Sequence, residues 1–253
     1  ISTLAPSNFL ATNPEAINQL ISTRGQSLTN GIMHLLDDLK EGKVSQTDKS
    51  SFEVGGNLAI TEGAVIFQNE LIQLIQYKPL TPTVYEKPLL MVPPSINKFY
   101  ILDLKPESSM VKFLVEEGFT IYLISWKNAD ESMKHLTWDD YVASGVVKAI
   151  QTVIEVSKLP KINILGFCIG GTLLASALAV LAQQNIHPAS SLTLLTSFLD
   201  FSDTGVLDVF IDETMVDMRE KTIGGTNGNY GLLSGTELAN TFSFLRPNEL
   251  VWN

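Results

Sequence analysis

The pattern of apolar and polar positions changes twice along this chain. In residues 1–50 apolar positions recur with a helical period, and Asn13 before Pro14 is typical of a helix N-cap followed by proline at the first helical position. From Phe52 to Leu199, short apolar strands alternate with helices. This alternation predicts an α/β fold on a mostly parallel, doubly wound sheet. Beyond Leu199 the alternation stops, and mixed apolar and glycine-rich stretches follow.

These changes predict the organisation of the chain. We expect a helical N-terminal segment at 1–50, an incomplete α/β core at 51–199 and the start of a lid inserted at 200–253. The predicted strands cover 52–60, 64–68, 70–77, 89–92, 120–124, 161–165 and 191–197, and the predicted core helices cover 108–117, 138–157 and 171–179.

The single cysteine lies between a predicted strand and a predicted helix, in Gly166-Phe167-Cys168-Ile169-Gly170. Glycine, any residue, nucleophile, any residue, glycine is the pattern of an α/β-hydrolase nucleophile elbow, with sulfur in place of the usual serine oxygen. Glycines are expected beside the nucleophile because Cβ atoms there would collide with the neighbouring strand and helix. The alternative is a buried structural cysteine at the start of a core helix.

Sulfur at this position narrows the chemistry. An acyl group that moves from a thioester to Cys168 remains a thioester, so the transfer is nearly isoenergetic, whereas a serine would trap it as a more stable ester. The predicted helix N-terminus also favours the thiolate that attacks. A cysteine elbow therefore indicates an acyltransferase that passes acyl groups between thiols.

Composition excludes several classes of protein. A net charge of −10 argues against a nucleic-acid-binding surface, and an anionic substrate would need a local cationic site. No apolar run approaches the roughly 18 residues of a membrane-spanning helix. A single cysteine forms no internal disulfide and fits a reducing cytosol. The spacing of Cys and His predicts no metal site.

Longer stretches of the sequence are typical of one family. These stretches are 8–15, 67–77, 93–104, 124–126, 166–175, 199–203 and 245–253. On them the chain resembles the polyhydroxyalkanoate synthases, and most of all the single-subunit type that acts on short-chain monomers; the resemblance implies an α/β-hydrolase fold. In the loop after Pro93 and Pro94, Ser95 stands where the family leads us to expect a bulkier residue.

The histidine base that a cysteine nucleophile needs is not evident in this chain. In α/β-hydrolases an acid and then a histidine follow the nucleophile, but His187 lies at the far end of the elbow helix, about 25 Å from the sulfur. His135 lies in a charged stretch typical of a solvated loop, and His34 belongs to the N-terminal helices. The resemblance implies an acid and a histidine beyond residue 253. We therefore expect a truncated chain that forms no polymer by itself.

The resemblance also implies a mechanism. Cys168 would take a 3-hydroxyacyl group, such as 3-hydroxybutyryl, from coenzyme A, and the hydroxyl of the next monomer would extend a polyester. The N–H of Ile169 would supply one oxyanion donor. Because prolines lack N–H groups, the second would come from Ser95, Ile96 or Asn97, and we favour Ile96. Lys98 could bind a coenzyme A phosphate or could be an ordinary solvated lysine.

The implied partners are the 3-hydroxyacyl-coenzyme A, the growing polyester, the granule surface in the cytoplasm and a second copy in a homodimer. Coenzyme A is the leaving group, and no cofactor is expected. The alternatives are a cysteine thioesterase or esterase on the same fold, and a non-catalytic module that binds the granule or a partner. Apolar residues of the lid would cover the entrance, make a dimer contact or simply pack within the lid; they are Phe198, Phe201, Val206, Leu207, Val209, Phe210 and Ile211.

Overall fold

The computed structural model describes residues 5, 7, 9, 11–42, 49–205, 211–224 and 231–245. The chain divides into two units, of which one comprises 1–49 with 235–253 and the other 50–234. The predicted lid residues Val206, Leu207, Val209 and Phe210 lie outside the described residues, as do 225–230 and 246–253. The division predicted from the sequence, into 1–50, 51–199 and 200–253, stays a prediction.

The first unit is helical. It contains α1 (Pro14–Ser22), α2 (Gln26–Glu41) and α8 (Gly235–Leu245). The side chain of Asn13 accepts hydrogen bonds from the backbone N–H groups of Glu15 and Ala16, at 2.9 and 3.2 Å, and Pro14 is the first helical residue. The N-cap predicted from Asn13-Pro14 is therefore confirmed.

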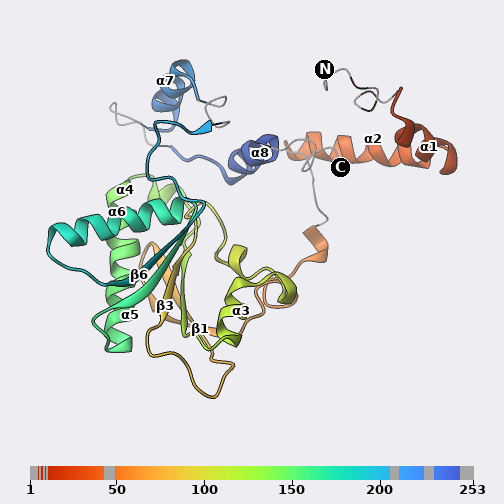
Figure 1. Ribbon diagram of the computed structural model, residues 1–253. Helices are drawn as coiled ribbons and strands as arrows, with labels where there is room; N and C mark the ends of the chain where they lie inside the picture. The colour runs from red at the N-terminus through yellow and green to blue at the C-terminus, as the bar shows by residue number, and fades with distance from the viewer. Residues whose placement is uncertain are drawn as a thin grey trace. The chain divides into compact units, whose positions relative to one another are not determined.

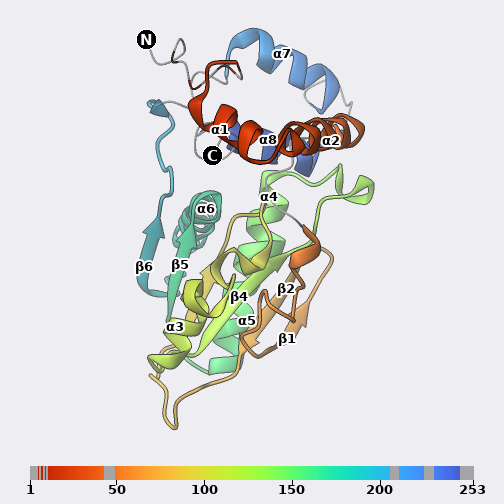
Figure 2. The ribbon, with the colours of Figure 1, turned by 90° about the vertical axis from the view of Figure 1, so that its right-hand side faces the viewer.

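The second unit contains a six-stranded sheet of order β1-β2-β4-β3-β5-β6 (Figure 2). The β1–β2 and β2–β4 pairs are antiparallel, and β4, β3, β5 and β6 are mutually parallel. The carboxyl ends of these four parallel strands therefore meet at one edge of the sheet. The strands are β1 (Gly63–Gln68), β2 (Ile72–Tyr77), β3 (Leu89–Val92), β4 (Ile121–Trp126), β5 (Ile162–Phe167) and β6 (Ala189–Leu195).

Helices cover both faces of the sheet (Figure 1). On one face α3 packs through Val111 and Val115 against Met91, Leu123 and their neighbours in the parallel strands. On the other face α5, α6 and the π-helix before α5 cover the larger core cluster. The helices of this unit are α3 (Met110–Glu116), α4 (Trp138–Asp140), the π-helix η7 (Tyr141–Val147), α5 (Lys148–Ser157), α6 (Ile169–Gln183) and α7 (Glu213–Thr222), with short 3₁₀ turns η3 (Lys49–Ser51), η4 (Phe99–Leu102), η5 (Pro106–Ser108) and η6 (Glu131–Met133).

Burial from both faces explains the continuous apolar strands. All four residues of β3 are buried, and β4 is buried except for the half-buried Ser125. Strands covered on both faces need apolar side chains at successive positions, not only at alternate ones. The predicted α/β-hydrolase fold is confirmed by this mixed sheet, the two helical layers and the strand order. None of the described helices is long and apolar enough to cross a membrane.

One predicted element is wrong. Residues 52–60 form a turn in place of a strand, because the carbonyl of Glu53 accepts hydrogen bonds from three successive N–H groups, at residues 56–58. The side chain of Asn57 closes the same turn by bonding the N–H of Glu53 and the carbonyl of Ser51. The helix predicted at 138–157 is confirmed with the same bounds, and its residues 141–147 are wound as a π-helix, which a pattern of apolar residues does not reveal.

Candidate active site

Cys168 occupies the sharp turn between β5 and α6, at the carboxyl edge of the parallel strands. Its φ of 54° and ψ of −130° lie in a region that L-residues seldom adopt. Such a conformation persists only where its surroundings hold it. The N–H of Cys168 donates to the carbonyl of Leu195 in β6 at 2.8 Å, and its carbonyl accepts from the N–H of Gly171 at 2.8 Å. The side chain is partly exposed and is not in a disulfide.

The glycines of the elbow are required by close backbone contact. A Cβ atom at Gly170 would overlap the carbonyl oxygen of Val92 and lie 2.6 Å from that of Pro93. A Cβ atom at Gly171 would overlap the hydroxyl of Ser197 and lie 2.7 Å from its Cβ. The elbow is therefore seated against the end of β3 on one side and the loop after β6 on the other.

Backbone N–H groups near Cys168 differ in whether they already have an acceptor. In the described part of the chain, the N–H of Ile169 has no hydrogen-bond acceptor, as is usual in the first turn of a helix. The N–H of Asn97 donates to the carbonyl of Pro94 at 3.2 Å and closes a turn. Ser95 and Ile96 at the centre of this turn have no such bond to any described residue. Of the three predicted loop donors, Asn97 is thus engaged, and Ser95 and Ile96 are available.

Lys98 lies in the same loop and is exposed. Its Nζ donates to the side-chain carbonyl of Asn128, which follows β4, at 2.7 Å. Lys98 forms no ion pair with any carboxylate among the described residues. The carboxyl edge of the sheet therefore carries a cation whose charge is not neutralised by a bonded anion.

Trp126, the last residue of β4, was not singled out from the sequence. Its indole N–H donates to the carbonyl of Pro93 at 2.9 Å, and the bond is buried. The indole ring lies 5.6 Å from the ring of Tyr141, centroid to centroid. The signal in the sequence is a tryptophan that ends a buried strand, but its partner is 33 residues away, so adjacency of β3 and β4 is needed to find it.

A second connection joins the elbow helix to the loop after β6. The hydroxyl of Thr172 donates to the carbonyl of Phe198 at 2.7 Å, and that of Ser197 donates to the carbonyl of Leu195 at 3.1 Å. Phe198 packs against Phe201 with ring centroids 5.6 Å apart, and both side chains are exposed. The start of the predicted lid, which follows β6, thus presents apolar rings close to the first turns of α6.

No histidine among the described residues is hydrogen-bonded to Cys168. His187 lies between the end of α6 and the start of β6, at the opposite edge of the sheet, as predicted. His135 is exposed in the loop after η6. The nearby Asp140 has its pKa lowered chiefly by hydrogen bonds from the backbone and hydroxyl of Thr137, with a smaller contribution from the His135 charge. His34 belongs to α2 in the other unit.

Asp200 follows β6 at the carboxyl edge, and no role for it was predicted. Its carboxylate accepts a hydrogen bond of 2.9 Å from the backbone N–H of Ser202. Bonds from the backbone and then the hydroxyl of Ser202 lower the pKa of this exposed carboxyl. The aspartate is therefore an anion engaged in its own turn.

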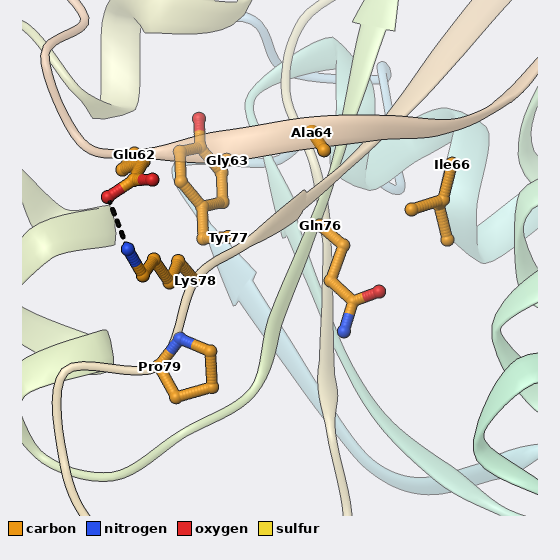
Figure 3. A pocket seen from close by; sticks show the side chains of 8 residues that line it. All are labelled: Glu62, Gly63, Ala64, Ile66, Gln76, Tyr77, Lys78 and Pro79. Atoms are coloured by element: carbon orange, nitrogen blue, oxygen red, sulfur yellow. Dashed lines mark hydrogen bonds and ion pairs between the residues drawn. The ribbon is translucent and has the colours of Figure 1, made fainter.

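A hollow of about 260 Å³ lies beside the strands β1 and β2. Figure 3 shows the side chains that line it. It is formed by β1 and β2, and an ion pair of 2.9 Å between Lys78 and Glu62 crosses its rim. Because β1 and β2 are separated from β5 by β4 and β3, the hollow does not belong to the elbow. Its lining residues are Glu62, Gly63, Ala64, Ile66, Gln76, Tyr77, Lys78 and Pro79.

Comparison with known proteins places this geometry in a family. Residues 1–114 match the profile described as poly-beta-hydroxybutyrate polymerase (PhaC) N-terminus, and residues 88–253 match the profile of the alpha/beta hydrolase fold. The poly(3-hydroxyalkanoate) polymerase subunit PhaC of Cupriavidus necator is 59% identical over the whole chain, and the poly(3-hydroxyalkanoate) polymerase of Methylorubrum extorquens is 42% identical. The chain spans 43% and 42% of the lengths of these two relatives. The chain therefore belongs to the alpha/beta hydrolase fold family, and over its whole length it is similar to part of the poly(3-hydroxyalkanoate) polymerases.

Proposed function

We propose that the protein containing this chain polymerises 3-hydroxyacyl groups, delivered by coenzyme A, into a polyester through a thioester on Cys168. The observation that carries the proposal is a cysteine in the strained elbow conformation, with a φ of 54°, at the start of α6. Relatives named as polymerases, at 59% and 42% identity, support the class of reaction. The short-chain monomer 3-hydroxybutyrate is the proposed substrate.

In the first step the Cys168 sulfur attacks the thioester carbonyl, the carbon–sulfur bond to coenzyme A breaks, and coenzyme A leaves as its thiol. The bond formed is of the same kind as the bond broken, so the step is readily reversible. The hydroxyl of the next monomer then attacks an acyl thioester, which breaks a carbon–sulfur bond and forms an ester. We assign the proton transfers to a histidine outside the described residues.

Both steps pass through a tetrahedral intermediate with a negative oxygen. The Ile169 N–H at the start of α6 is one proposed donor to this oxygen. The second is the N–H of Ile96, with Ser95 as the alternative, because the Asn97 N–H already donates to Pro94. A donor with no protein acceptor can bond the oxyanion without first breaking a bond.

Lys98 is the proposed contact for a coenzyme A phosphate. The net charge of −10 would otherwise disfavour an anionic substrate. Lys98 is held by a neutral amide, Asn128, at 2.7 Å, so its charge remains available. Coenzyme A acts as carrier and leaving group, and thioester exchange requires no redox cofactor. The growing polyester, the granule surface in the cytoplasm and a second copy of the protein are the remaining proposed partners.

A thioesterase would use the same elbow, and only the acceptor of the acyl group would differ. The test is to incubate the intact protein with 3-hydroxybutyryl-coenzyme A and follow both released coenzyme A and the acyl product, with Cys168→Ala as the control. Coenzyme A release together with insoluble polyester is the expected result. Free 3-hydroxy acid in equal amount to coenzyme A, with no polymer, would favour the thioesterase. No coenzyme A release by the intact protein would favour a non-catalytic binding module.

A further inference from the structure

We propose that Trp126 is a positioning residue for the acyl-transfer reaction, because its indole N–H holds the Pro93 carbonyl and thereby fixes the loop that carries the second oxyanion donor. The inference rests on the proposed function. It concerns one hydrogen bond, of 2.9 Å, between the last residue of β4 and the first residue after β3.

The loop after β3 has few other ways to be held. The pairing of β3 with β5 ends at Val92 and Gly166, so the carbonyl of Pro93 lies beyond the sheet and has no strand partner. Pro93 and Pro94 have no N–H groups with which to donate to a neighbouring segment. Both prolines are buried, and a buried carbonyl needs a donor. Trp126 supplies this donor from the adjacent strand.

The same carbonyl contacts the elbow. A Cβ atom at Gly170 would lie 2.6 Å from the oxygen of Pro93 and 2.7 Å from its carbonyl carbon. The Pro93 peptide is therefore confined between the indole N–H on one side and the first turn of α6 on the other. Ile169, the first donor, precedes Gly170, and Ile96, the second, lies three residues after Pro93. Any shift of the Pro93 peptide changes the distance between the two donors.

The indole itself is held in place from behind. A Cβ atom at Gly145, in the π-helix η7, would lie 2.6 Å from a carbon of the indole ring. Tyr141 of the same segment packs against the ring. The π-helix therefore packs against the indole of Trp126, and the indole N–H in turn holds the loop after β3. Displacing an oxyanion donor by about 1 Å is costly, because such a donor acts only at hydrogen-bond distance.

The test compares two reactions of the same thiol in the intact protein. Acylation by 3-hydroxybutyryl-coenzyme A passes through an oxyanion, whereas alkylation by iodoacetamide does not. Trp126→Phe keeps an aromatic side chain but replaces the indole by a smaller phenyl ring that has no N–H. We expect the rate of acylation of Cys168 to fall about 10- to 100-fold, with the rate of alkylation changed by less than about twofold. A general loss of structure would lower acylation and alter alkylation together.

Trp138→Phe is the matched control, because Trp138 is an exposed tryptophan in α4, and it should change neither rate. Gly145→Ala places a methyl group against the indole and should displace it. This variant should reproduce the selective loss of acylation although Trp126 itself is not substituted. Unchanged acylation in both Trp126→Phe and Gly145→Ala would overturn the inference, as would equal effects on the two reactions. Absence of acylation in the unsubstituted protein would instead count against the proposed function.

Discussion

The N–H of Cys168 donates to the carbonyl of Leu195 across a distance of 2.8 Å, so the candidate nucleophile is itself the last hydrogen-bonded residue between β5 and β6. Its own carbonyl accepts from Gly171 in the first turn of α6. The strained backbone is thus fixed on one side by a strand and on the other by a helix. This explains how a non-glycine residue keeps a φ of 54° at this point.

Gly171→Ala should destabilise the protein chiefly through its contact with Ser197, with a second tight contact to Leu194. The new Cβ would overlap Ser197, whose own Cβ would be only 2.7 Å away. We expect a loss of about 1–3 kcal/mol in the free energy of unfolding, as for overpacking elsewhere. The measurement is urea denaturation of the intact protein.

The double variant Gly171→Ala with Ser197→Gly removes the obstructing atoms and should recover part of this loss. Ser197→Gly alone should cost about 1 kcal/mol, because its bond to the Leu195 carbonyl disappears. We expect a favourable coupling on the order of 1 kcal/mol between the two substitutions. Strictly additive effects would show that the elbow is not seated against Ser197.

Lys98→Ala should weaken binding of the proposed coenzyme A substrate more than it slows turnover. Loss of one exposed cation facing a phosphate corresponds to a rise of KM by about three- to tenfold. Lys161→Ala, just before β5 at the opposite edge of the sheet, is the matched control and should leave KM unchanged. The difference between the variants should shrink at high salt, because ions screen exposed charges. Equal KM values for both variants at low salt would remove Lys98 from the substrate site.

Tyr77→Phe should reduce the loss of stability at high pH. Burial, and then the negative charge of Asp103, raises the pKa of Tyr77 well above its ordinary value of 10.0. Above that value the unfolded chain loses the phenol proton while the folded protein retains it, so the free energy of unfolding falls by up to about 1.4 kcal/mol per pH unit. This contribution is fully present below pH 10 and is lost as the pH rises through the folded pKa.

The Tyr77 hydroxyl is buried with no hydrogen-bond partner among the described residues, so Tyr77→Phe should cost little at pH 7. Urea denaturation at pH 7 and near pH 11 measures both effects. Tyr85→Phe, at an exposed tyrosine, should follow the unsubstituted protein at both values. A Tyr77→Phe protein that loses stability with pH as steeply as the unsubstituted protein would show that the phenol ionises equally in both states.

The elbow could be predicted from the sequence because its signals are local. The apolar strand before Gly166, the glycines and the apolar helix after them lie within a few turns of chain, and β3 matches its predicted bounds of 89–92. The predicted placement of His187 away from the nucleophile also follows from the direction of one helix.

Long-range contacts could not be predicted in the same way. The bond from Trp126 to Pro93 depends on β4 lying beside β3, and the seating of Gly171 on Ser197 depends on β6 lying beside β5. The turn at 53–58 was missed because the apolar residues of this segment are spaced as in a strand. The side chain of Asn57 closes a turn there instead, by bonding Glu53 and Ser51. Each of these features depends on which segments meet, not on the period of any single segment.

Mass spectrometry of the intact protein after brief reaction with 3-hydroxybutyryl-coenzyme A tests the central claim most directly. The account predicts one 3-hydroxybutyryl group on the peptide that contains Cys168, released by hydroxylamine as expected for a thioester. Cys168→Ala should show neither the adduct nor polymer. A Cys168→Ala protein that still forms polyester, or an acyl group carried by another residue, would contradict it.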